Sequence, residues 1–154
     1  MLKILVVEDD ESKREAIRTV LGKLKWKTDI SFAHSVRRAI DCLGDSNFDL
    51  VVADMSLPTY DIETRERGGT PRPFGGIEVF EYLERIENSI PVVVVTSYPI
   101  LTDGKKSLSY VDLQNQLSRE FPDNYIGLVY YDSTYADWEH AFSKILNQTF
   151  PGAK

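Results

Sequence analysis

Cysteine, clustered positive charge and long apolar stretches are all scarce in this chain of 154 residues. The single cysteine, Cys42, cannot form an internal disulfide, so a reducing compartment fits the chain. A formal net charge of -6 argues against a nucleic-acid-binding surface, because such a surface needs clustered lysine and arginine. No apolar run approaches the length of a membrane span, and the first residues lack the pattern of a secretion signal. We therefore expect a cytoplasmic protein that contacts neither nucleic acid nor a membrane directly.

What is present predicts a single α/β domain of ordinary composition, with 42% hydrophobic and 27% charged residues. Five short segments rich in β-branched residues are interpreted as buried strands, at residues 3–7, 28–32, 48–53, 91–96 and 125–131. Segments with helical spacing of apolar residues separate them. The first of these helices is expected to have Ser12 as its N-cap, with Glu15 completing a capping box. This alternation predicts a doubly wound parallel sheet of five strands with helices on both faces.

Two of the predicted connections are longer than those of most compact domains. The first covers residues 58–73 and is polar, mixed in charge and rich in glycine. The second covers residues 97–124 and is expected to contain a helix at about residues 110–119. Loops of this length in a compact domain are usually either functional or mobile.

Carboxylates follow two of the predicted strands. Glu8 and Asp9 come directly after the first strand, and Asp54 follows the third. The carboxyl ends of parallel strands meet at one edge of a sheet, where ligands bind, and Thr96 ends the fourth strand there. Neighbouring carboxylates repel unless a cation or proton offsets their charge, and Mg²⁺ is the natural candidate because it prefers oxygen ligands. A carboxylate such as Asp54 can also attack a phosphoryl group and form an acyl phosphate.

Three segments in this order resemble the receiver domains of two-component response regulators. They are the opening strand with its acids at residues 2–10, the phosphoacceptor strand at residues 48–55, and the fourth strand with its hydroxyl residue at residues 91–97. The resemblance covers roughly the whole chain. It implies a flavodoxin-like (βα)5 fold with strand order 2-1-3-4-5. Residues 1–150 would form one receiver-like domain, with expanded loops at about 57–75 and 98–124 and no output domain.

The resemblance also implies a role for each site residue. Glu8 and Asp9 would bind Mg²⁺ together with Asp54, and the backbone carbonyl of Met55 would be a further ligand. Asp54 would be the phosphoacceptor, and Thr96 would be the hydroxyl residue of the switch. The expected partners are a histidine kinase or phosphotransfer protein and a downstream effector, or a second copy of the chain.

The fifth strand departs from the family, which has a lysine at its end that pairs with the phosphoryl group. No lysine or arginine occurs between Arg119 and Lys144. Depending on register, the lysine position falls on Leu128 or on Tyr130 and Tyr131. Cations of the two expanded loops are candidate replacements, namely Arg65, Arg67, Arg72, Lys105 and Lys106.

Three functions remain open at this point. The first is a stand-alone receiver that takes a phosphoryl group from a phosphohistidine donor onto Asp54, with no turnover beyond its own phosphorylation. The second is a pseudo-receiver, a binding module that is independent of phosphate, which the missing lysine favours. The third is a Mg²⁺-dependent phosphohydrolase with Asp54 as nucleophile. Haloacid-dehalogenase phosphatases have a second aspartate two residues after the first, and Ser56 occupies that place here.

Overall fold

Strands and helices alternate along the chain in the computed structural model, which describes residues 1–57, 75–97, 100–103, 106–132, 134 and 137–150. A parallel sheet has the order β2-β1-β3-β4-β7. Its strands are β1 (Leu2–Val7), β2 (Thr28–Ala33), β3 (Leu50–Ala53), β4 (Val92–Thr96) and β7 (Tyr125–Tyr130). The predicted five-stranded doubly wound sheet is confirmed, since β7 is the fifth strand of the order 2-1-3-4-5.

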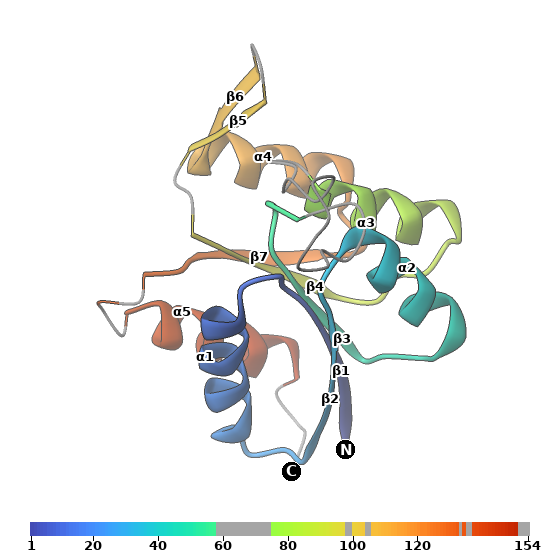
Figure 1. The fold of residues 1–154 in the computed structure, drawn as a ribbon, viewed down its shortest axis with the longest axis vertical. Helices are drawn as coiled ribbons and strands as arrows, with labels where there is room; N and C mark the ends of the chain where they lie inside the picture. The colour runs from blue at the N-terminus through green and yellow to red at the C-terminus, as the bar shows by residue number, and fades with distance from the viewer. Residues whose placement is uncertain (58–74, 98–99, 104–105, 133, 135–136, 151–154) are drawn as a thin grey trace, which may run out of the picture.

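Helices cover both faces of the sheet (Figure 1). The helices are α1 (Glu11–Gly22), α2 (Val36–Asp45), α3 (Gly75–Arg85), α4 (Tyr110–Glu120) and α5 (Asp137–Thr149). Helices α1 and α5 pack on one face, and α2, α3 and α4 pack on the other. None of the helices in the described ranges is long and apolar enough to cross a membrane.

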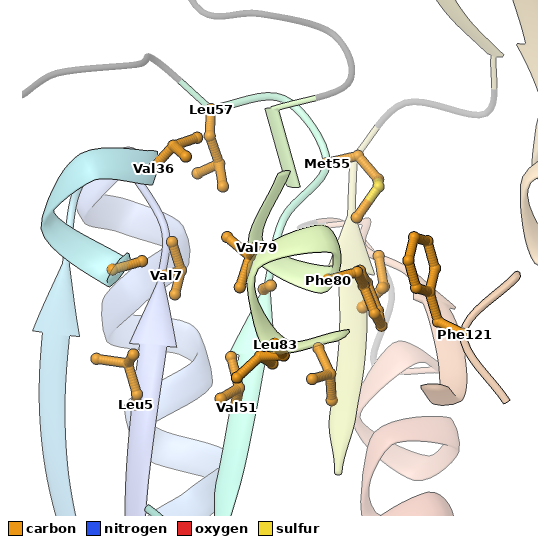
Figure 2. Packing of buried hydrophobic residues seen from close by; sticks show 14 of the residues in the cluster. Leu5, Val7, Val36, Val51, Met55, Leu57, Val79, Phe80, Leu83 and Phe121 are labelled. Atoms are coloured by element: carbon orange, nitrogen blue, oxygen red, sulfur yellow. The ribbon is translucent and has the colours of Figure 1, made fainter. Parts of the chain in front are cut away.

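Alternation along the strands divides the core between these two layers, because successive side chains of a strand point to opposite faces. In β4, Val92 and Val94 belong to the cluster beneath α2, α3 and α4, whereas Val93 and Val95 belong to the cluster beneath α1 and α5. Figure 2 shows the first cluster, with the side chains of α3 directed toward the sheet. A central strand buried on both faces must be apolar throughout, which explains the uninterrupted valine run of β4.

Helix α1 begins earlier than the sequence analysis predicted. Its N-cap is Asp10, whose carboxylate accepts a hydrogen bond of 3.0 Å from the backbone N–H of Ser12. The predicted cap at Ser12 is therefore wrong, because an aspartate caps as well as a serine and occurs two residues earlier. The shift places Lys13 in the first turn of the helix. There it is buried on the same face as Ile17 and Val20.

The second long connection contains α4, as predicted, and also a two-stranded antiparallel hairpin that was not predicted. The hairpin consists of β5 (Ile100–Asp103) and β6 (Lys106–Ser109). In Figure 1 it projects away from the central sheet next to α4. The segments ILTD and KSLS lack the uninterrupted apolar run that marked β3, so four residues of mixed polarity gave no strand signal in the sequence. The first long connection falls almost entirely on residues 58–74, outside the described residues.

Helix α3 starts in direct contact with the backbone that follows β3. The N–H of Gly76 donates a hydrogen bond of 2.9 Å to the carbonyl of Met55. A Cβ atom at Gly76 would collide with the backbone oxygen of Asp54 and would lie 2.5 Å from the Met55 Cε and 2.9 Å from its Cα. Only glycine permits this close approach of backbone to backbone. The first turn of α3 therefore holds the backbone of Asp54 and Met55 in place.

Replacing Gly76 tests this contact. We expect Gly76→Ala to destabilise the protein by about 1–3 kcal/mol, because the added methyl overpacks a buried backbone contact. The matched control is Gly22→Ala at the end of α1, where an added Cβ has nothing within 4 Å. That variant should be neutral or slightly stabilising, because alanine has the higher helix propensity. Urea unfolding of both variants measures the difference, and equal stabilities would contradict the contact.

Candidate functional site

A pocket of about 120 Å³ opens at the carboxyl edge of the sheet, between the ends of β1, β3 and β4. In the sheet register, Val7 pairs with Ala53, so the residues that follow these strands leave the sheet at the same level. The N–H of Asp54 also donates a hydrogen bond of 3.1 Å to the carbonyl of Val7. The described residues that line the pocket are Glu8, Asp9, Asp10, Lys13, Asp54, Ser56 and Ser97.

Three carboxylates meet in this pocket, as the sequence predicted. Glu8, Asp9 and Asp54 each present an oxygen within 4.8 Å of the other two. Glu8 and Asp54 are buried, with 1% and 5% of their surface exposed, and Asp9 is half-buried. This set of oxygen donors fits a small divalent cation, because hard cations such as Mg²⁺ bind carboxylate oxygens and retain waters.

The sequence analysis missed Lys13, which provides a cation of this site among the described residues. Lys13 is 1% exposed, and its Nζ lies 2.7 Å from Glu8 Oε1 and 3.2 Å from Asp54 Oδ2. A signal was available in the sequence, because Lys13 falls four residues before Ile17 and seven before Val20, on the apolar face of α1. A lysine in the first turn also opposes the helix dipole, so it is an unfavourable choice for the helix alone.

The charges of this group are strongly coupled. Burial raises the pKa of Glu8 to about 8, and the neighbouring Asp54 carboxylate acts in the same direction, against the lowering effect of Lys13. Burial likewise raises the pKa of Asp54, although Lys13 partly offsets it. For Lys13, burial lowers the pKa, but attraction to the two carboxylates outweighs this effect and the pKa is raised. Lys13 therefore remains an ammonium ion, and the two acids compete for its charge.

Both oxygens of Asp54 have a partner. Oδ1 accepts a hydrogen bond of 2.7 Å from the backbone N–H of Met55, and Oδ2 contacts Lys13. These contacts fix the orientation of the carboxylate. The Met55 carbonyl accepts the hydrogen bond from Gly76, and Ser56 lines the pocket in place of Met55. The proposed role of the Met55 carbonyl as a metal ligand stays a prediction.

Thr96 lies at the end of β4, and its side chain is buried with 1% exposure. Its Oγ1 has no hydrogen-bond partner among the described residues. The neighbouring hydroxyl residue, Ser97, lines the pocket. A buried hydroxyl without a partner is costly, so Thr96 is available for an acceptor that enters the site.

The sequence analysis considered Leu128, Tyr130 and Tyr131 as positions for the missing lysine. Of these three, Tyr131 is the one that contacts a residue of the pocket, Lys13. Its ring centroid is 5.7 Å from the Nζ of Lys13, and its N–H donates a hydrogen bond of 2.7 Å to the carbonyl of Thr96. Leu128 instead belongs to the core beneath α2, α3 and α4, and Tyr130 is 42% exposed. Tyr131 therefore lies at the end of β7, beside Lys13 and next to Thr96, but it is not among the residues that line the pocket.

The loop cations considered as replacements are not tested. Arg65, Arg67, Arg72 and Lys105 lie outside the described residues, and Lys106 is the first residue of β6. Among the described side chains, Lys13 provides a cation contact to Asp54.

A second hollow of about 180 Å³ lies at the opposite edge of the sheet, between the ends of α3 and α4. Among the described residues, its lining includes the acids Glu84, Glu87 and Asp123 but no lysine or arginine. Ligands of parallel α/β sheets bind at the carboxyl ends of the strands, and this hollow lies at the amino ends. The smaller pocket around Asp54 is therefore the candidate site.

Comparison with known proteins agrees with this geometry. Residues 4–126 match the response regulator receiver domain family. The chain belongs to this family. A curated relative, the Detocs response regulatory protein DtcB of Enterobacter cloacae (strain JD6301), is 24% identical over 140 residues, which cover 90% of this chain and 93% of the relative.

Solved receiver structures share the fold. The Mn²⁺-bound form of response regulator Rcp1 has a TM-score of 0.65 and 15% identity, with coverage of 100% of this chain and 98% of that chain. Response regulator TrrA of Thermotoga maritima, solved in complex with Mg²⁺-BeF, has a TM-score of 0.58 and 18% identity, with coverage of 94% and 99%. At these identities the structural likeness concerns the fold.

Thr96 allows one test of the site without any ligand. We expect Thr96→Val to raise the free energy of unfolding by about 1 kcal/mol, because valine has the same shape and removes a buried hydroxyl without a partner. The control is Thr19→Val on α1, whose hydroxyl is exposed and donates to the carbonyl of Glu15. Urea unfolding without divalent cations measures both. A destabilised Thr96→Val protein would show that the hydroxyl has a partner.

Glu8 makes the stability of the protein depend on pH in a direction that follows from its pKa. Folding raises this pKa from 4.5 to about 8, so between these values the folded protein holds a proton that the unfolded chain has released. The resulting stabilisation is fully present below about pH 4.5 and is lost as the pH rises through about 8. Relative to Glu8→Gln, the wild type should therefore lose stability as the pH rises through this window.

Urea unfolding at a series of pH values, without divalent cations, measures this loss. The matched control is Glu15→Gln, at an exposed position of α1. Parallel pH profiles for the wild type and Glu8→Gln would contradict the raised pKa of Glu8.

Proposed function

We propose that this chain is a receiver that accepts a phosphoryl group on Asp54 and thereby acts as a phosphorylation-controlled protein-interaction switch. The observation that supports this most directly is the position of the Asp54 carboxylate. It lies at the end of central strand β3, beside two further acids and in contact with a buried ammonium. This arrangement occurs in a chain of the receiver domain family.

The proposed donor is a phosphohistidine of a histidine kinase or phosphotransfer protein. An Asp54 oxygen forms a bond to phosphorus, the P–N bond breaks, and its electron pair returns to the imidazole of the donor. The product is an acyl phosphate. Because Met55 holds Oδ1, the oxygen that contacts Lys13, Oδ2, is the proposed nucleophile. Lys13 offsets negative charge on Asp54 and so favours its anionic, nucleophilic form.

Mg²⁺ is the proposed cofactor, with Glu8, Asp9 and Asp54 as its protein ligands. Three carboxylates and one ammonium have a formal charge of 1 - 3 = -2 when all are ionised, which one divalent cation balances. When bound, the metal neutralises charge on the phosphoryl oxygens. A pocket of about 120 Å³ leaves room for a cation with several waters, since about 10–15 Å³ of such volume is enough to hold one water.

The proposed switch uses Thr96. A phosphoryl group on Asp54 offers an acceptor to the buried Oγ1 that has no partner among the described residues. Reorientation of Thr96 would reach β7, because the Thr96 carbonyl accepts the N–H of Tyr131. The altered surface around the ends of β4 and β7 would bind an effector protein or a second copy of the chain. We place this signalling in the cytoplasm, where histidine kinases present their phosphohistidine.

A second candidate function, the pseudo-receiver, is favoured by one observation. Lys13 already neutralises part of the acidic charge without a metal or a phosphoryl group, since it bridges Glu8 and Asp54. An internal ion pair of this kind could hold the pocket in one state permanently. Partner binding would then not depend on phosphorylation.

Phosphorylation separates these functions. The protein is incubated with Mg²⁺ and either acetyl phosphate or phosphoramidate, whose P–N bond resembles that of phosphohistidine, and its intact mass is recorded. We expect a single phosphoryl adduct on the wild type and none on Asp54→Asn, because the amide is not a nucleophile. Asp49→Asn, at an exposed residue before β3, is the matched control and should still be phosphorylated.

Each other outcome identifies an alternative. No adduct on a folded wild type with either donor would exclude the receiver function and favour the pseudo-receiver. Continuous release of phosphate from simple phosphate esters, lost in Asp54→Asn, would indicate a phosphohydrolase.

A further inference from the structure

The fifth strand contributes no cation to the pocket, although the proposed chemistry gathers negative charge there. None of residues 120–143 is lysine or arginine. At the end of β7 the chain has Tyr131, whose backbone N–H donates a hydrogen bond to the carbonyl of Thr96 at the end of β4. The ring of Tyr131 also packs edge-on against Trp138 of α5, with centroids 4.9 Å apart and planes at 62°. This position is therefore occupied by an aromatic side chain held in place from two sides.

A lysine from another element reaches the same place. Lys13 extends from the first turn of α1, and its Nζ lies 5.7 Å from the centroid of the Tyr131 ring. At this distance an ammonium is attracted to the face of an aromatic ring. The same Nζ contacts Asp54 Oδ2 at 3.2 Å. Lys13 thus lies between the proposed phosphoacceptor and the residue at the end of β7.

We propose that Lys13 binds the phosphoryl group on Asp54, so that the phosphate-pairing lysine of this protein comes from helix α1 instead of the fifth strand. The inference rests on the proposed function and names a further residue of that site. Tyr131, at the end of β7, would support the ammonium through its ring.

The contacts of Lys13 suit this role. Its shorter contact is with Glu8 Oε1, at 2.7 Å, so the ammonium remains anchored when its contact to Asp54 changes. An ammonium has three N–H donors and can bond a phosphoryl oxygen in addition to a carboxylate. Phosphorylation replaces the Asp54 carboxylate, with one negative charge, by a phosphoryl group with up to two. The attraction of Lys13 to this position therefore increases.

The origin of the lysine has a structural consequence. A lysine on β7 that bound the phosphoryl group would displace a strand of the sheet. Lys13 instead belongs to α1, which packs with α5 on one face of the sheet. Its contact with Tyr131, and through this ring with Trp138, links the pocket to both helices of that face.

Returning the lysine to the strand tests the proposal. The rate of adduct formation with acetyl phosphate and saturating Mg²⁺ is compared among the wild type, Lys13→Met, and Lys13→Met combined with Tyr131→Lys. We expect the rate of adduct formation to fall by about 10- to 100-fold in Lys13→Met, which is the size of a lost charge-assisted contact.

The double variant should form the adduct at least about tenfold faster than Lys13→Met, because its new lysine lies beside the position that the Lys13 ammonium leaves. Lys23→Met, at the exposed end of α1, is the control and should match the wild type.

Two further measurements make the result decisive. Circular dichroism establishes that each variant is folded. If Lys13→Met is not, Lys13→Gln replaces it, because the amide can still donate to Glu8 without a charge. Thermal shift with Mg²⁺ and beryllium fluoride measures binding of a phosphoryl mimic without chemistry, and we expect Lys13→Met to lose most of the shift.

The possible failures can be told apart. Adduct formation in folded Lys13→Met at the wild-type rate or faster would overturn the role of Lys13 and leave the receiver function intact. If the double variant formed the adduct no faster than Lys13→Met, the idea that a lysine on α1 replaces the lysine of the fifth strand would be overturned. No adduct and no beryllium fluoride binding in the wild type would overturn both this inference and the proposed function.

Discussion

The ion pairs of Lys13 with Glu8 and Asp54 are the interaction on which the arrangement of the pocket depends. Each of the three side chains is at least nine-tenths buried, and none of them would be stable there as an isolated charge. The lysine offsets the repulsion between the two carboxylates, and the carboxylates in turn keep the lysine charged. Because the three residues come from α1, the end of β1 and the end of β3, the pairs also fix a helix against two strands.

The same interaction limits the chemistry that the pocket can perform. One ammonium cannot neutralise three carboxylates, so the remaining negative charge favours a proton, as the raised pKa of Glu8 indicates, and would be balanced by the proposed divalent cation. The backbone around Asp54 cannot adapt freely to new ligands, because α3 packs against it at Gly76. A ligand therefore meets a carboxylate that is held by its neighbours and a charged lysine beside it.

Contacts lead from the pocket into both layers of the fold. Met55 follows Asp54 and is buried in the core beneath α2, α3 and α4, as Figure 2 shows. On the other face, Lys13 contacts Tyr131, which packs against Trp138 in the layer of α1 and α5. A change of charge at Asp54 would therefore affect side-chain contacts on both faces of the sheet. The surface that a partner binds depends on which of these two sets of contacts changes.

The sequence by itself determined the sheet, its strand order by resemblance, and the meeting of Glu8, Asp9 and Asp54. This was possible because β-branched runs form strands, and parallel strands bring their carboxyl ends to one edge regardless of loop details. Only the tertiary structure placed Lys13 against Glu8 and Asp54, through the packing of α1 against the sheet. The loop cations that the sequence analysis considered, after Asp54 and after Thr96, stay a prediction, because their side chains lie outside the described part of the structure. Pattern along the chain specifies which elements form, whereas contact between side chains of separate elements depends on how those elements pack.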